Sequence, residues 1–108
     1  MIYQVMLTRD AAFDLDELHR YIEQHDMPEK ADYVLDQLEE ALISLSSNPQ
    51  RGICPKELVV IGLREYREIY FKPYRIIYRV MDDKVYVMLI ADGRRDMQSL
   101  LQHRLLRA

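Results

Sequence analysis

One apolar stripe constrains the fold of this chain more than any other feature of its sequence. Its members recur every three or four residues, the spacing that brings side chains onto one face of an α-helix. The stripe ends at Ser46-Ser47-Asn48-Pro49, a combination that stops helices. A helix of this kind is stable where another element covers its apolar face. The stripe consists of Ala31, Val34, Leu35, Leu38, Ala41, Leu42 and Leu45.

A second helix is predicted just before the first. Thr8 has the side chain of an N-cap, and apolar residues at helical spacing follow it. Asp26-Met27-Pro28 breaks the pattern, and Pro28 suits the first position of the next helix. Two antiparallel helices joined by a short break form an αα-hairpin. The apolar residues of the earlier helix are Ala11, Leu15, Leu18 and Ile22.

Four segments favour β-strands, namely residues 1–7, 66–71, 74–81 and 84–91. Residues 74–81 alternate between two faces, which places Arg75 and Arg79 on the same one. The last strand is apolar on both faces, so we expect it to be central in its sheet. Lys72-Pro73 and Asp82-Asp83 are suited to turns, and the second of these tolerates positive φ. Residues 50–56 are predicted to be a loop and residues 97–106 a final short helix.

The elements together predict one α+β domain over residues 1–108, with the order β-α-α-β-β-β-α. In this arrangement the N-terminal strand and the helical hairpin pack on an antiparallel sheet. The sheet is the only large surface that can cover the helical stripe. We therefore expect two layers, with the helices gathered on one face of the sheet.

Composition narrows the cellular setting. The single cysteine, Cys54, excludes an internal disulfide and suits a reducing compartment. The N-terminus does not resemble a signal peptide, and the apolar runs are too short to cross a bilayer. These features predict a cytoplasmic protein.

Charge is distributed unevenly along the chain. Residues 1–50 carry eleven acidic and three basic residues, whereas residues 51–108 carry seven acidic and twelve basic ones. The net charges of the two halves are therefore −8 and +5. A basic face suggests an anionic partner, although solvated faces that segregate by chance give the same sums.

Arginines cluster in the predicted sheet and at its ends. If helices cover one face, we expect Arg75 and Arg79 to point outward from the other, with their Cα atoms roughly 13 Å apart. Guanidinium groups recognise phosphates, and neighbouring tyrosines could stack on bases. The alternative is that these are ordinary sheet residues paired with Glu65 and Glu68. The residues concerned are Arg64, Arg67, Arg75, Arg79, Arg94 and Arg95, with Tyr66, Tyr70 and Tyr74.

Catalytic and metal-binding signals are weak in comparison. RNA cleavage needs a base, an acid and cations for the phosphate, and His103 is the best candidate for proton transfer. A lone histidine is more often a surface residue. His19 and Glu23 are four residues apart, but no metal-ligand motif accompanies them. Cys54 matches no catalytic signature. We therefore expect no metal and no cofactor.

These segments, in this order and spacing, resemble the ParE/RelE superfamily of toxins from type II toxin–antitoxin systems. The resemblance covers nearly the whole chain and implies the same fold. It also implies an antitoxin that wraps the toxin with a helical, often disordered segment. The matching segments are residues 11–22 (AAFDLDELHRYI), Asn48-Pro49-Gln50-Arg51-Gly52, Tyr66-Arg67-Glu68, residues 74–80 (YRIIYRV) and Gly93-Arg94-Arg95-Asp96, followed by a leucine-rich tail.

The superfamily divides by target. ParE-like members poison DNA gyrase, whereas RelE-like members cut mRNA on the ribosome. Arg75 and Arg95 fall where RelE-like toxins keep arginines near the scissile phosphate, and Arg67 falls near a position often held by lysine. Ile69, however, stands where a second lysine is common. The stretch that would hold a catalytic tyrosine contains Leu100, Leu101 and Leu105. The sequence therefore resembles ParE more closely.

The resemblance implies a toxin for plasmid stabilisation and growth inhibition that inhibits gyrase as a binding protein, not as an enzyme. The expected target-binding residues are Arg67, Arg75, Arg79, Arg94 and Arg95. The alternative is a ribosome-dependent endoribonuclease that uses Arg67, Arg75, Arg95 and His103. A third hypothesis is an inert relative whose role is confined to antitoxin binding or autoregulation. The implied partners are a cognate antitoxin and gyrase, or the ribosome and mRNA. Both a homodimer and a toxin–antitoxin hetero-oligomer are compatible with the sequence, and no residue is assigned to antitoxin binding.

Overall fold

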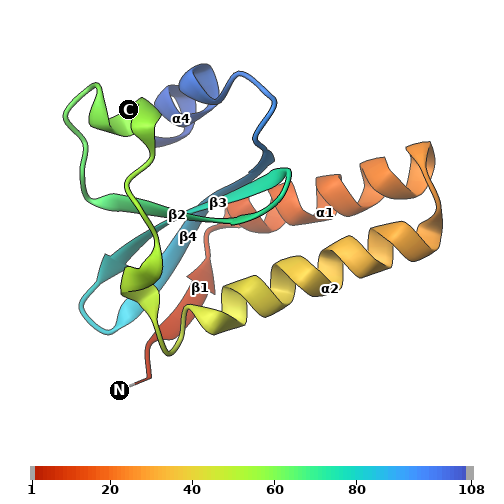
Figure 1. Ribbon diagram of the computed structural model, residues 1–108, viewed down its shortest axis with the longest axis horizontal. Helices are drawn as coiled ribbons and strands as arrows, with labels where there is room; N and C mark the ends of the chain where they lie inside the picture. Colours follow the sequence, from red (N-terminus) through yellow and green to blue (C-terminus); the bar gives the residue numbers. More distant parts are fainter. Residues whose placement is uncertain (1, 107–108) are drawn as a thin grey trace.

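The computed structural model describes residues 2–106, which form a helical hairpin, a four-stranded sheet and two short helices (Figure 1). The predicted element order is confirmed, with two short elements added between the hairpin and the second strand. Among the described residues, no helix is long and apolar enough to cross a membrane. The elements are β1 (Gln4–Leu7), α1 (Arg9–His25), α2 (Pro28–Ser44), the 3₁₀ turn η1 (Pro49–Arg51), α3 (Lys56–Val59), β2 (Tyr66–Phe71), β3 (Tyr74–Met81), β4 (Lys84–Asp92) and α4 (Met97–Leu106).

The sheet has the strand order β1-β4-β3-β2. β2, β3 and β4 are antiparallel neighbours, as predicted, and β4 is central. The turn between β3 and β4 places Asp82 at φ 57°, the conformation expected of that turn. β1 lies parallel to β4, so the sheet is mixed and not wholly antiparallel. β1 covers the edge that β4 would otherwise leave open.

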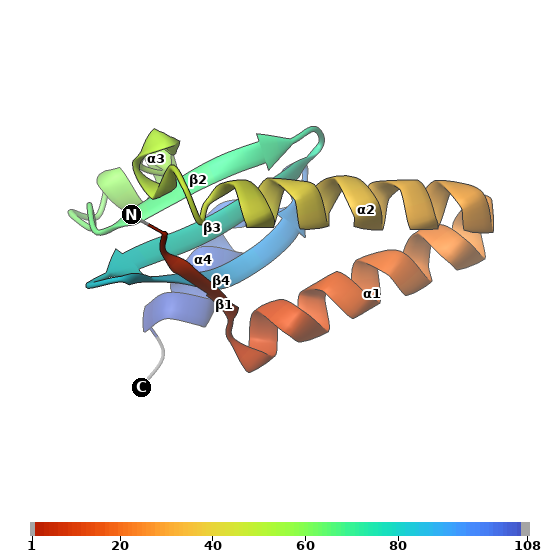
Figure 2. The ribbon, with the colours of Figure 1, turned by 90° about the horizontal axis from the view of Figure 1, so that it is seen from below.

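The helical hairpin forms as predicted and covers one face of the sheet. The Thr8 hydroxyl accepts a hydrogen bond from the Ala11 amide at 3.1 Å, and Pro28 begins α2. Ile76 and Tyr78 of β3 are buried against the stripe of α2, together with Val85 and Val87 of β4. Figure 2 shows α1 and α2 side by side, with their connection projecting beyond the sheet. The hairpin is therefore anchored at the sheet and free at its tip.

The opposite face of the sheet is also covered, which corrects the expected two-layer arrangement. α3 and α4 lie together over this face and form a second core with β2, β3 and β4 (Figure 1). Leu58 of α3 and Leu101 of α4 are fully buried there. The apolar residues on both faces of β4 require cover on both sides, and α3 with α4 supplies the second. Residues 50–56, predicted as a loop, include the last two residues of η1 and the first residue of α3.

An irregularity in β4 allows that strand to serve both cores. Val87 pairs with Tyr78 and Leu89 with Ile77, so Met88 is an extra residue in the ladder. Such a bulge shifts the alternation of side chains. Val85 and Val87 consequently face the hairpin, whereas Leu89 packs in the second core.

Candidate functional site

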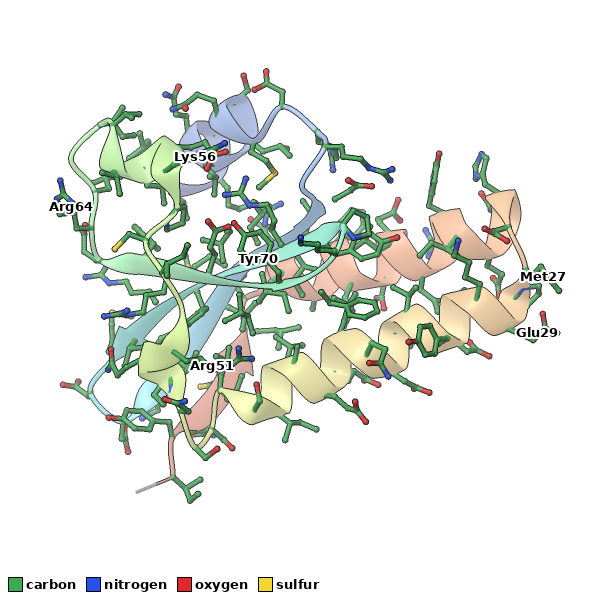
Figure 3. All side chains as sticks on the ribbon, in the orientation of Figure 1. Met27, Glu29, Arg51, Lys56, Arg64 and Tyr70 are labelled. Atoms are coloured by element: carbon green, nitrogen blue, oxygen red, sulfur yellow. The ribbon has the colours of Figure 1, made fainter. Side chains whose placement is uncertain are left out.

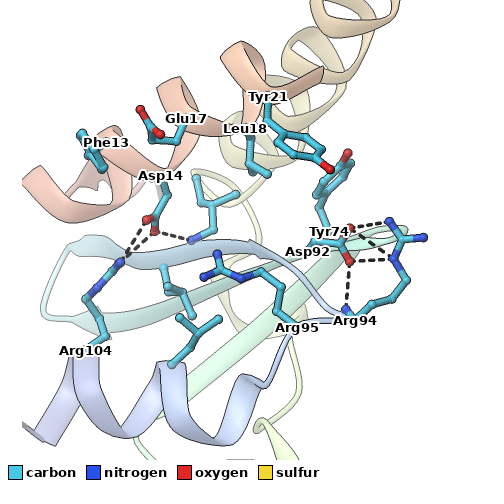
Figure 4. A pocket seen from close by; sticks show the side chains of 13 residues that line it. Phe13, Asp14, Glu17, Leu18, Tyr21, Tyr74, Asp92, Arg94, Arg95 and Arg104 are labelled. Atoms are coloured by element: carbon cyan, nitrogen blue, oxygen red, sulfur yellow. Dashed lines mark hydrogen bonds and ion pairs between the residues drawn. The ribbon is translucent and has the colours of Figure 1, made fainter. Parts of the chain in front are cut away.

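An open cleft lies between α1, the end of β4 and the start of α4 (Figure 4). It encloses about 670 Å³. Arginines and carboxylates lie along its edges, and apolar side chains line much of its wall. Segments from both ends of the chain therefore build one concave surface.

One wall of the cleft is a face of α1. Phe13, Glu17 and Tyr21 lie on successive turns of this helix and line the cleft together with Leu18. Phe13 is 62% exposed and Tyr21 61% exposed. The Tyr21 ring stacks on His25, with 4.2 Å between their centroids. Large aromatic side chains left in water beside a cleft are typical of a surface that another molecule covers.

A partly buried ion pair joins this wall to α4. The Asp14 carboxylate accepts hydrogen bonds from both terminal nitrogens of Arg104, at 2.9 and 3.0 Å. It also accepts one from the Ile90 amide at 3.0 Å, at a point where β4 has run past the end of β1. Arg104 donates further to the Met88 carbonyl at the bulge. The hydrogen bond with Asp14 raises the pKa of Arg104 above its ordinary value, so the guanidinium remains charged.

The end of β4 forms the opposite edge. Asp92 accepts hydrogen bonds from the backbone amide and the Nε of Arg94, each at 2.9 Å. These bonds hold the pKa of the Asp92 carboxyl below its usual range. Gly93 leaves room for Arg75, because a Cβ there would lie 2.7 Å from the Arg75 Cδ. The side chain of Arg95 forms no hydrogen bond or ion pair with a described residue, so it is available to a partner at this edge.

Arg75 does not point outward into solvent, which corrects the expectation for this residue. It lies on the face opposite the hairpin, as the alternation predicts, but α3 covers that face and leaves the residue 6% exposed. Its Nε donates to Glu68 at 2.6 Å, and its two terminal nitrogens donate to Glu57 at 2.9 and 2.7 Å. The bonds with Glu57, and then those with Glu68, raise the pKa of Arg75 above its ordinary value. Its hydrogen-bonding capacity is largely used within the protein.

The remaining predicted arginines do not converge on one site. Arg67 lies on the hairpin side of β2, where it donates to the Gln50 and Gly52 carbonyls at 3.2 and 2.7 Å. Arg79 lies on the other face, over the Tyr66 ring with 5.8 Å to its centroid. Tyr66 pairs with Arg79, whereas the cleft residue Tyr74 stands at the other end of β3. Arg94 and Arg95 are therefore the predicted arginines that share the cleft.

The structure assembles no acid–base pair around these arginines within residues 2–106. His103 is exposed on α4, outside the cleft lining. Ile69, at the position compared above with a lysine, is buried in the core beneath the hairpin. Leu101, in the stretch compared above with a catalytic tyrosine, is buried in the second core. Glu57 has a lowered pKa because Arg75 donates hydrogen bonds to it, which makes it a weaker base. Nor do three or more histidine, cysteine or acidic side chains gather anywhere in this part of the chain to hold a metal ion.

Comparison with known proteins assigns the family. Residues 5–97 match the sequence model described as the ParE toxin of the type II toxin–antitoxin system parDE. The chain belongs to the ParE toxin family. A relative, toxin ParE3 of Caulobacter vibrioides, is 29% identical over 98 residues, which cover 91% of this chain and 94% of that protein.

Solved structures share the fold of this ParE-family toxin. The chromosomal ParDE toxin–antitoxin system of P. aeruginosa superimposes with a TM-score of 0.70 at 20% identity, covering 84% of this chain and 96% of that one. The RelBE2 toxin–antitoxin complex of Mycobacterium tuberculosis gives 0.62 at 22% identity, with 85% and 92% covered. A mutant of E. coli RelE in the free state gives 0.64 at 17% identity, with 93% of each chain covered. ParE and RelE proteins thus share this architecture.

Sequence reasoning missed three charged residues that shape the site. Asp14 and Arg104 clamp α1 to α4, and Glu57 neutralises Arg75. Asp14 stands between Ala11 and Leu15 on the apolar side of its helix, which was the available signal that it is partly buried. Glu57 carried no such signal, because its helix has only four residues.

Proposed function

We propose that this toxin inhibits DNA gyrase by binding and that a cognate antitoxin neutralises it in the cytoplasm. The observation that carries the proposal is the state of Arg75, which two carboxylates hold inside the protein. An arginine that serves a scissile phosphate must turn its donors toward the substrate. Here those donors meet Glu57 and Glu68 instead.

The surrounding chemistry also supports binding over catalysis. Cleavage of RNA requires a group that accepts a proton and a group that donates one, within hydrogen-bonding reach of the same phosphate. Glu57 and Glu68 are engaged by Arg75, and His103 does not line the cleft. A gyrase poison needs no such pair. It needs only to bind one conformation of its target more tightly than the others.

The cleft supports the existence of a protein partner. Exposed aromatic residues beside an arginine are enriched at protein interfaces, and Phe13, Tyr21 and Arg95 provide this combination. Two of the similar structures are described as toxin–antitoxin systems or complexes. We expect the antitoxin to present an acidic, partly apolar segment, because much of the cleft wall is apolar and Arg95 at its edge pairs with no carboxylate of the described residues.

The test is a cleavage assay with purified components. The antitoxin-free toxin is incubated with DNA gyrase, ATP and supercoiled plasmid, and linear DNA is measured after detergent and protease treatment. Toxin-dependent linear DNA, lost when the cognate antitoxin is added first, is the expected result. Absence of linear DNA and unchanged supercoiling, with a folded toxin that arrests growth, would reject gyrase and turn attention to mRNA cleavage on the ribosome.

A cleft variant sharpens this assay. We propose that gyrase contacts the Arg95 edge of the cleft in the free toxin, so Arg95→Gln should reduce linear DNA about tenfold at a fixed toxin concentration, the size of effect when an interface arginine is removed. Arg20→Gln makes the same charge change on an exposed helical face and should leave cleavage unchanged. Arg75→Ala is a poor probe of either activity, because it would leave two carboxylates buried without their cation.

A further inference from the structure

The basic residues of this toxin divide into two groups by their partners. Arg75, Arg94 and Arg104 are paired with carboxylates. A second group forms no ion pair with any residue in the range 2–106 and gathers where β2 begins and β3 ends. We call this group the arginine end. It consists of Arg51, Arg64, Arg67 and Arg79.

Strand register and hydrogen bonds place these four residues around the β2 edge of the sheet. Arg79 pairs with Tyr66, between Arg64 and Arg67 in the sequence. Arg67 reaches back to the carbonyls of Gln50 and Gly52, on either side of Arg51. Figure 3 shows Arg64 at one edge of the molecule and Arg51 beside the end of α2, both far from Met27 and Glu29 at the tip of the helical hairpin. The arginine end therefore extends around the β2 edge of the sheet, with Arg67 on the hairpin side and Arg79 on the other face.

The charge of this region is not cancelled by its neighbours. The carboxylates nearest in sequence are Glu65, Glu68, Asp82 and Asp83, and no ion pair joins any of these four to the arginine end, since Glu68 pairs with Arg75. Asp83 pairs with Lys84 instead. The acidic residues of the chain lie mainly in the first fifty positions, which include the hairpin. The molecule is thus polarised, and an extended anion would meet it arginine end first.

We infer that the arginine end binds the sugar–phosphate backbone of duplex DNA. Guanidinium groups pair with phosphate oxygens through parallel N–H donors, and these four retain donors for that purpose. Binding to single strands usually adds exposed aromatic rings on which bases stack. Here Tyr66 is only 9% exposed and lies beneath Arg79. The exposed Tyr70 stands four residues further along β2, roughly 13 Å away. Tyr86, which pairs with Arg79 across the strands, is half-buried, so the surface is richer in cations for a backbone than in exposed rings for bases.

The inference makes a quantitative prediction about salt. Each phosphate neutralised on duplex DNA contributes about −0.9 to the slope of log affinity against log salt concentration. Four contacts give a slope of about −3.6, and so a loss on the order of 100-fold in affinity between 50 and 200 mM salt. Sequence preference should be small, because backbone contacts carry no base information.

The test uses the full toxin without gyrase or antitoxin, so its outcome is independent of the proposed target. Binding to a fluorescent duplex is followed by anisotropy across a salt series. The variant combines Arg51→Gln, Arg64→Gln and Arg79→Gln, and leaves Arg67 in place because it supports two backbone carbonyls. We expect the salt slope to fall in magnitude by about 2.7. Thermal melting checks that the variant folds.

A matched control carries the same change of net charge elsewhere. It combines Arg9→Gln, Arg20→Gln and Lys30→Gln, the three basic residues of the first fifty positions, all exposed. This control should bind duplex DNA like the parent. If both triple variants lost the same affinity for duplex DNA, net charge alone would explain the loss and the inference would be overturned. Tighter binding to single-stranded DNA than to the duplex would overturn the inference. So would displacement of the labelled duplex by polyglutamate as effectively as by unlabelled duplex of equal total charge, because the surface would then bind any polyanion.

Discussion

At the scale of single residues, Gly52 is a position where neighbouring atoms come so close to the backbone that there is no room for a larger side chain. A Cβ at this position would lie 2.3 Å from the Tyr78 hydroxyl and 2.8 Å from the Glu68 carbonyl. The Gly52 amide donates to that hydroxyl, which itself donates to the Pro49 carbonyl at 2.6 Å. Its φ of −73° is ordinary, so the requirement is for space and not for conformation.

We therefore predict that Gly52→Ala destabilises the toxin by about 1–3 kcal/mol through overpacking. The measurement is the urea midpoint at unchanged m-value. Tyr78→Phe removes one of the two clashing atoms, so Gly52→Ala should cost less in that background than in the parent. Strict additivity of the two changes would show that the hydroxyl is not the obstacle.

The sequence predicted the position of a single side chain only where the pattern of its neighbours along the chain determines that position. Alternation along β3 correctly placed Arg75 opposite the helical hairpin. It could not show that the face was covered, because the cover comes from segments eighteen residues before it and more than twenty after it. Gly52 was predicted to lie in a loop, but its contact with Tyr78 spans 26 positions. Such approaches depend on tertiary packing, which local pattern does not encode.

At the scale of elements, the four-residue helix α3 depends on its ion pair with the sheet. A helix of one turn has little stability of its own. The Glu57 side chain is 11% exposed and receives two hydrogen bonds from Arg75, which are the first cause of its lowered pKa. A carboxyl with a depressed folded pKa contributes stability above its unfolded pKa, and this contribution disappears as pH falls through the folded value.

Glu57→Gln should accordingly lower the free energy of unfolding at neutral pH by about 1–3 kcal/mol, the cost of weakening a buried charged hydrogen bond. The difference from the parent should shrink as pH falls below the ordinary carboxyl value of 4.5 and through the lower folded value. Denaturant unfolding from pH 7 to pH 3 provides the measurement. Glu40→Gln, on an exposed position of α2, is the control. A pH-independent difference for Glu57→Gln would contradict an ionic origin.

Long elements were predictable and short ones were not. The periodicity of residues 31–45 and the cap at Thr8 predicted α2 and the start of α1, because seventeen-residue helices contain several repeats of the pattern. α3 and η1 have four and three residues, too few to show a period. The sequence pattern did not predict the bulge at Met88 for a related reason. In a strand apolar on both sides, one extra residue leaves the pattern unchanged.

At the scale of the whole molecule, two cores share one sheet. The class, the order of the long elements and the central position of β4 followed from the sequence. The parallel pairing of β1 and the cover over the second face did not, because both join parts of the chain distant in sequence. The Asp14–Arg104 pair is the clearest such link. It joins α1 to α4 across 90 positions and couples an element of each core.

This link predicts energetic coupling between the two ends of the chain. Asp14→Asn and Arg104→Gln should each destabilise the toxin, because each leaves a partly buried charge without its partner. The double variant should be more stable than the sum of the single changes predicts, by about 0.5–3 kcal/mol. Asp10 approaches the same arginine at 3.7 Å from a more exposed position, so a cycle with Asp10→Asn should give a smaller coupling. Denaturant unfolding of the six proteins measures both cycles. Equal coupling in the two would mean that Arg104 responds to the general negative charge of α1. A larger value for Asp14 would mean that the last helix is held in place by one specific bond to the first.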